Sequence, residues 1–166
     1  RGLWGGAGKN PNRNTQRNPQ WLGQLPKQYE GKEVLAVGFP QGAPETSARY
    51  PEGTPLLLVA AVNNFGSLNG HVPRRAYMEQ GADKTREKAA PILQRLILKI
   101  NALEMTKPEA LKILGPVAVG QHQAAIVELQ DPANAESTVA RKQSSNPLID
   151  TGLLRQSVTF IVRAGE

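Results

Sequence analysis

Two segments of the chain have the hydrophobic pattern of β-strands, one early and one at the end. Residues 33–39 (Glu-Val-Leu-Ala-Val-Gly-Phe) are rich in strand-forming side chains and lie between a glycine and a proline. Residues 158–162 carry large apolar side chains at every second position, which places them on one face. We expect the two segments to pair in one small sheet, antiparallel or mixed.

The middle of the chain has the spacing of two long helices. The first follows residues 71–75 and contains Pro91, which predicts a break or kink. The second begins at a capping box of Thr106 and Glu109, runs to about residue 129, and should be kinked at residues 115–116. Apolar side chains beyond Pro91 recur at helical spacing and should face the core: Leu93, Leu96, Ile97, Ile100 and Leu103.

A short apolar run over residues 56–62 fits either a strand or a buried helix turn, because periodicity does not separate the two in so short a segment. A helix is favoured, since Thr54 can cap it and Pro55 suits its first position. Residues 63–66 (Asn-Asn-Phe-Gly) then predict a turn that ends the helix, with Phe65 buried as the anchor of that turn.

Two stretches rich in proline, glycine and polar residues predict long loops, at residues 40–55 and 131–149. The second loop should include a short helix near residues 138–142. Asp150 is expected to cap one more helical turn over residues 151–156.

These elements predict an α+β fold, in which a small sheet is packed with two long helices. Residues 31–166 should form a single α+β domain. Residues 1–30 carry five basic residues and one acid but few apolar side chains, so they cannot fold alone and are expected to be an extended basic arm. Four side chains of this arm are candidates for docking on a neighbouring subunit: Trp4, Arg13, Arg17 and Trp21.

Composition excludes several kinds of site. The chain has no cysteine, which excludes disulfides, thiolate metal sites and a cysteine nucleophile. Its two histidines, His71 and His122, lie far apart in sequence, and we expect no metal and no cofactor. No apolar run reaches the roughly 18 residues that cross a membrane, so no membrane partner is expected. A first residue other than Met is typical of a processed chain or of one whose beginning is missing.

Two motifs resemble catalytic or nucleotide-binding sequences but lack the necessary context. Asp150, Thr151 and Gly152 spell the active-site triplet of aspartic proteases, yet two leucines follow where that family needs a small residue, and the long helices do not fit its all-β chain. Residues 5–10 are glycine-rich and contain a lysine, but the phosphate-loop spacing fails and no strand precedes them. We therefore expect no catalytic residues and no enzyme activity.

The net charge of +6 allows a nucleic-acid partner, an acidic protein partner, or neither. Two short basic pairs, Arg74-Arg75 and Arg141-Lys142, are either solvated surface or contacts to an acidic partner or phosphates. Neither pair has the interleaved aromatic residues of a single-strand platform. The net charge nevertheless keeps a basic nucleic-acid-binding protein as an alternative function for this chain.

Several short phrases within residues 33–163 follow one another in an informative order. Residues 59–66 (Val-Ala-Ala-Val-Asn-Asn-Phe-Gly), which include Phe65 and Gly66, precede residues 72–78 (Val-Pro-Arg-Arg-Ala-Tyr-Met), which include Pro73. Residues 137–142 (Ser-Thr-Val-Ala-Arg-Lys) and 146–158, with Asp150, Thr151 and Gly152, come later. Together they resemble a pattern in the morphogenesis proteins of tailed bacteriophages, although asparagine stands at position 64 where glutamate is common and residues 76–77 replace Pro-Phe.

This resemblance implies a structural virion protein of the phage neck or tail end, a tail-completion or tail-terminator subunit that joins head and tail. Such proteins form rings, usually of six copies, between the head connector and the tail tube, and they catalyse nothing. The implied partners are further copies of the chain, the tail tube protein and the connector or stopper proteins. DNA would at most pass through the lumen of the ring. The implied location is the virion neck or tail, with the host cytoplasm during assembly.

Overall fold

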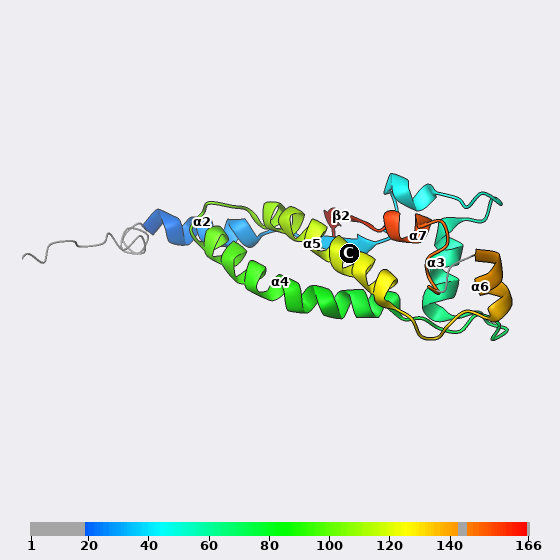
Figure 1. The fold of residues 1–166 in the computed structure, drawn as a ribbon. Helices are drawn as coiled ribbons and strands as arrows, with labels where there is room; N and C mark the ends of the chain where they lie inside the picture. Colours follow the sequence, from blue (N-terminus) through cyan, green and yellow to red (C-terminus); the bar gives the residue numbers. More distant parts are fainter. Residues whose placement is uncertain (1–18, 143–145, 166) are drawn as a thin grey trace, which may run out of the picture.

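The computed structural model describes residues 19–142 and 146–165. Its helices and strands follow one another along the chain as α2 (Pro19–Tyr29), β1 (Glu33–Gly38), the 3-10 helix η1 (Pro44–Ser47), α3 (Leu56–Phe65), α4 (Tyr77–Asn101), α5 (Lys107–Glu128), α6 (Glu136–Lys142), α7 (Leu153–Gln156) and β2 (Thr159–Ala164). The domain is elongated: α2 lies at one end, and α3, α6 and α7 gather at the other (Figure 1).

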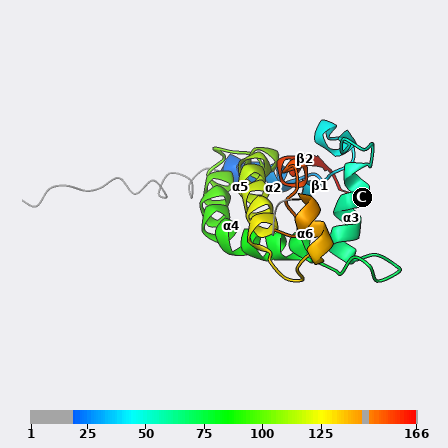
Figure 2. The same ribbon diagram turned by 45° about the vertical axis from the view of Figure 1, so that its right-hand side comes forward.

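The two predicted strands pair with each other, which confirms the α+β class. Strand β1 runs antiparallel to β2, from Glu33 opposite Ala164 to Gly38 opposite Thr159. Helix α5 contacts both strands and also packs along α4, so it lies at the centre of the domain (Figures 1 and 2).

The first core cluster joins α4 and α5 beside the sheet. It contains the buried side chains of Leu96, Ile100, Ala110 and Leu114, and Leu35 of β1 packs against it. Next to this cluster Gly115 of α5 lies under the ring of Phe160, so close that a Cβ atom at position 115 would be 2.3 Å from that ring. A glycine is needed here because it lets the helix approach β2.

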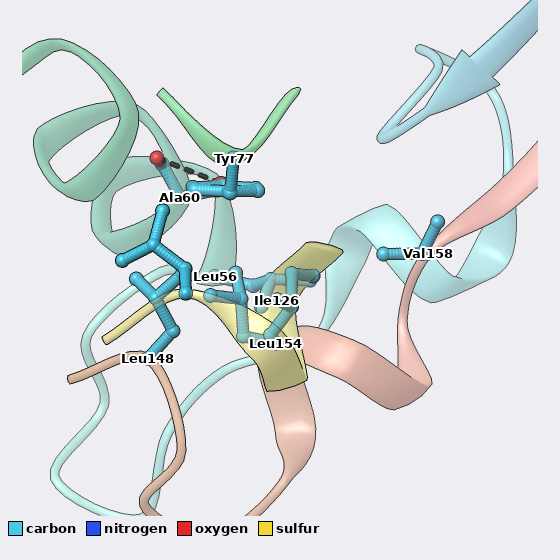
Figure 3. Packing of buried hydrophobic residues seen from close by; sticks show 8 residues of the cluster. Leu56, Ala60, Tyr77, Ile126, Leu148, Leu154 and Val158 are labelled. Atoms are coloured by element: carbon cyan, nitrogen blue, oxygen red, sulfur yellow. Dashed lines mark hydrogen bonds between the residues drawn. The ribbon is translucent and has the colours of Figure 1, made fainter. Parts of the chain in front are cut away.

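The second core cluster lies at the α3 end of the domain (Figure 3). Its largest fully buried side chains come from α3, α4, α5 and α7: Leu56, Tyr77, Ile126 and Leu154. The Tyr77 hydroxyl donates a hydrogen bond of 2.9 Å to the carbonyl oxygen of Ala60 in α3. This bond satisfies the one polar group that the tyrosine brings into the core.

Helix α3 confirms the preference for a helix over a strand, but its ends differ from the prediction. Pro55 occupies the N-cap position with no side-chain cap, and the helix continues through residues 63–65, which we expected to form a turn. Gly66 ends it with a φ of 85°, a conformation that glycine adopts without steric cost.

The prediction that Phe65 is buried is wrong. Helix α3 turns Leu56, Ala60 and Asn64 inward at a spacing of four residues, so Phe65 points outward and is 70% exposed. The buried residue of this turn is Asn64, whose Oδ1 accepts the backbone N–H of Met78 at 3.0 Å.

The two long helices continue through their prolines. Helix α4 spans Pro91 without the predicted break, and α5 contains Pro116. Of the five side chains expected to face the core, Leu96 and Ile100 are buried, but Leu93 and Ile97 are exposed. A narrow buried stripe is sufficient because α4 packs mainly against α5. The predicted capping box is present, and the Thr106 N–H donates to Glu109 Oε2 at 2.8 Å.

Asp150 is not the cap of the following helix. The N-cap of α7 is Gly152, which has a φ of 79°, and the N–H of Leu153 donates to Thr151 Oγ1 at 3.3 Å. Asp150 lies two residues before the cap and forms no bond to the helix start, because the left-handed turn at Gly152 delays the helix.

Residues 19–29, part of the segment expected to be an extended arm, instead form helix α2. The hydroxyl of Tyr29 donates to Asn101 Oδ1 at 2.6 Å and ties α2 to the end of α4. Trp4, Arg13 and Arg17 lie outside the described residues.

Candidate functional site: the Arg75 cavity and two apolar faces

Arg75 is a buried arginine that connects three distant parts of the chain. Its side chain is 3% exposed and donates only to neutral acceptors. The bonds run from Nε to the Pro132 carbonyl at 2.8 Å, from Nη1 to Asn63 Oδ1 at 3.0 Å, and from Nη2 to Asn134 Oδ1 at 3.0 Å and the Ala133 carbonyl at 3.3 Å. Its backbone N–H donates to the Asn63 carbonyl at 2.9 Å. Thus Arg75 holds the start of α4, the end of α3 and the loop after α5 together.

A cavity of about 330 Å³ opens beside Arg75. Its lining comes from the loop before α3, from α3, the turn before α4, the loop after α5, and the segment from α6 to α7. The ionisable lining residues are Tyr50, Glu52, His71, Arg75 and Asp150. The described residues contain no cluster of three or more His, Asp or Glu side chains that could hold a metal ion.

Burial sets the electrostatics around the cavity. Burial raises the pKa of the Tyr50 phenol, and the negative charges of Asp150 and Glu52 raise it further. Burial also raises the pKa of Tyr77, which keeps its hydroxyl protonated as the donor to Ala60, and lowers the pKa of Arg75. Asp150, exposed at the cavity, thus acts on Tyr50 by its charge rather than on a helix by capping.

The four sequence segments singled out above, residues 59–66, 72–78, 137–142 and 146–158, each contribute to the lining of this cavity. Residues 59–66 and 72–78 contribute Asn63, Pro73 and Arg75, while Thr138 and Asp150 come from the two later phrases. Segments separated by 57 to 59 positions are joined directly by the Arg75 hydrogen bonds. The spatial convergence was not predictable from the order of the phrases.

Gly66 and Pro73 belong to the turn between α3 and α4. The Ser67 N–H donates to the Val72 carbonyl at 2.9 Å, which closes the turn. A Cβ atom on Gly66 would lie 3.2 Å from both the Arg74 nitrogen and the Val72 oxygen, so the close crossing also favours glycine.

The residues of the two basic pairs do not form one common contact surface as predicted, because Arg74 and Arg75 differ in burial. Arg75 is an internal residue, which corrects its assignment to a partner contact, since it is buried and each of its three side-chain nitrogens bonds inside the chain. Arg74 is exposed and pairs with Glu79 at 2.7 Å. Trp21 lies in α2, and Arg141 and Lys142 lie in α6; the placement of these side chains is outside the described part of the structure.

Two exposed apolar faces lie at opposite ends of the elongated domain (Figure 1). The first, which we name the α3 face, consists of Leu57, Leu58, Phe65 and Leu68. The second, the α4 face, consists of Leu93, Ile97 and Leu98 near the C-terminal end of α4. Four of these side chains are more than half exposed: Leu58 at 55%, Phe65 at 70%, Leu98 at 68%, and Leu68, which is fully exposed. Several large apolar side chains exposed on one element are typical of contact sites.

The side chains of Asn63, Asn64 and Asn134 organise this end of the domain, and sequence reasoning missed all three. The two adjacent asparagines were interpreted as turn residues because asparagine is common in turns. Their amide oxygens instead accept from Arg75 and Met78. Nothing local marks this role, since Arg75 and Met78 lie 12 or more positions from the asparagines whose oxygens they bond.

No helix in the described part of the chain is long and apolar enough to cross a membrane. Comparison of the chain with protein-family models, with curated proteins and with solved structures finds no match.

Proposed function

We propose that the chain is a structural subunit of the neck or tail end of a tailed bacteriophage, which assembles as a ring that joins head and tail. The sequence phrases supply the family assignment. The observation that carries the assembly role is the pair of apolar faces at opposite ends of one subunit.

A closed ring of identical subunits needs two different surfaces on each copy, because a head-to-tail contact joins one surface to the other. The α3 face and the α4 face are two different surfaces of the kind that assembly contacts use. Burying an exposed large apolar side chain stabilises a contact by about 1.5–3 kcal/mol when burial is complete, so a few such side chains suffice for a specific interface.

In this role the ring has about six copies, and its partners are the tail tube protein on one side and the connector or stopper on the other. DNA passes at most through the lumen. The cavity beside Arg75 then serves to hold the end of the subunit that carries the α3 face, and no reaction is required of it.

Measuring the mass of the purified full chain by light scattering and imaging the particles by electron microscopy tests the proposal. We expect a ring, and we expect Phe65→Ser to weaken assembly about fivefold to thirtyfold, for a loss of about 1–2 kcal/mol at each contact. The folded subunit should be unaffected because Phe65 is already exposed.

Val127→Ser is the matched control, since Val127 is 38% exposed and lies outside both faces. A chain that stays monomeric at all concentrations contradicts the proposal. Duplex DNA binding that weakens steeply with salt, with a logarithmic slope of about −0.9 for each phosphate contact, would instead favour the nucleic-acid-binding alternative.

A further inference from the structure

The two-stranded sheet leaves both of its outer edges open. The N–H of Gly165 donates to the Lys32 carbonyl, which makes these two residues a hydrogen-bonded pair of the ladder. Because such pairs alternate in an antiparallel ladder, Leu35 and Val37 of β1, and Phe160 and Val162 of β2, point their backbone groups away from the partner strand. Within the described residues, no backbone group of another segment bonds to these four.

Helix α5 covers only one face of the sheet, and the other face is mixed, with Thr159 and Arg163 beside its apolar side chains. Leu35 and Phe160 pack toward α5. The opposite face carries Val34, Ala36 and Ile161, and Val34 is 42% exposed.

These edges lack the usual protection against pairing with another chain. Neither strand contains a proline, and the ladder runs through six consecutive pairs without a bulge. Charged side chains occur only near one end, at Glu33 and Arg163.

We infer that this sheet is completed by a second copy of the chain, with the open edge of β2 in one subunit pairing with the open edge of β1 in the next. This inference rests on the proposed ring and specifies its contact: subunits paired edge to edge lie side by side, so the α3 and α4 faces at the two ends of each subunit would face the layers on either side of the ring. A second copy is favoured because each subunit has one open edge of each kind, both six residues long, so a single repeated contact satisfies both. A strand from an unrelated protein would satisfy one edge and leave the other open.

The polarity of the strands fits this arrangement. When a rotation about an axis roughly along the strands relates the subunits, β1 of the neighbour runs parallel to β1 of the first copy. It is therefore antiparallel to β2, which is the more favourable pairing.

Two substitutions of Val162 distinguish the effect of its outward-pointing backbone N–H on assembly from the effect of its side chain. Val162→Pro deletes the outward N–H, while Val162→Ala removes a similar amount of side chain and keeps the donor. We expect the proline variant to assemble about threefold to tenfold more weakly than the alanine variant for each hydrogen bond lost. Circular dichroism checks that both variants are folded. If both are folded and assemble with the same affinity, the inference is overturned.

Cross-linking gives a second test that does not depend on proline. The chain has no cysteine, so a disulfide can form only between introduced residues. Val34→Cys or Ala36→Cys is mixed with a tagged copy carrying Thr159→Cys or Ile161→Cys, since paired Cβ atoms of neighbouring strands lie about 4.5–5.5 Å apart.

Strand pairing predicts a mixed disulfide for at least one of these combinations. A ring that forms without any mixed disulfide overturns the strand pairing and leaves the ring intact. Disulfides between identical variants alone indicate a twofold contact and also overturn it. A chain that never assembles contradicts the proposed function itself, and the inference fails with it.

Discussion

Arg75→Met should destabilise the fold far more than any exposed arginine substitution. The variant keeps much of the side-chain volume but removes all four side-chain hydrogen bonds of Arg75. Its acceptors, two backbone carbonyls and the amide oxygens of Asn63 and Asn134, would then lack the guanidinium donor.

The magnitude follows from the number of bonds and from access to water. Each bond contributes about 0.5–1.5 kcal/mol, and a buried acceptor left without any partner costs about 1–3 kcal/mol. The neighbouring cavity is large enough to admit water, which favours the lower values. We therefore expect a loss of about 3–5 kcal/mol in the free energy of unfolding, and about 1–3 kcal/mol for Arg75→Lys, which keeps the charge without the planar donor array.

Urea unfolding followed by circular dichroism measures these losses, and Arg74→Met is the matched control. Arg74 forms an ion pair with Glu79 in which both side chains are about half exposed, so its loss should cost less than about 1 kcal/mol. If Arg75→Met and Arg74→Met unfold at the same urea concentration with the same slope, the assigned role of Arg75 is wrong.

Four further substitutions test other parts of the structure. Gly115→Ala should destabilise the fold by about 1–3 kcal/mol in thermal or urea unfolding, because the new Cβ meets the Phe160 ring. Gly120→Ala in the same helix meets nothing within 4 Å and should stabilise the fold by about 0.5–1 kcal/mol. A change of the same sign in both variants would refute the close packing at Gly115. Asp150→Asn should change the unfolding free energy by less than about 0.5 kcal/mol, since Asp150 caps no helix, and a large loss would contradict this. The same variant should lower the pKa of Tyr50 toward its ordinary value, which a phenolate absorbance titration detects. Burial and neighbouring acids raise the Tyr50 pKa in the folded state. The contribution of Tyr50 to the free energy of unfolding is therefore present below the ordinary pKa of about 10 and is lost as the pH rises through the raised value. Tyr50→Phe, which cannot ionise, should reduce the loss of stability at alkaline pH.

Local patterns predicted the elements, while contacts distant in sequence decided which side chains are buried. The strands, the long helices and the capping box at Thr106 follow from propensity and spacing within a few residues. The exposure of Phe65 does not, because extending α3 by one turn exchanges the inner residue for its neighbour. Only Asn64, held by Met78 from the next helix, determines that the helix extends this far with Asn64 inside.

Arg75 shows the same limit for charge. In the sequence it is one of two adjacent arginines, and a basic pair is usually solvated. Its burial depends on acceptors from residues 132–134, which the turn after α5 brings back to the start of α4. No pattern within either segment specifies that meeting.

Helix α3 carries both the hydrogen bonds of the buried polar network around Arg75 and the exposed α3 face, so the two features are structurally linked. One side of α3 is fixed by Asn63 on Arg75, by Asn64 on the Met78 N–H and by the Ala60 carbonyl on Tyr77. The other side presents the α3 face, whose side chains have no such support. Buried polar bonds need defined distances and directions, so they restrict the position of α3 more tightly than apolar packing alone. Forming an assembly contact costs less conformational entropy when the contact surface is already held in place. The buried Arg75, with its neutral acceptors, is suited to holding α3 in place, even where an apolar residue could give the fold equal stability.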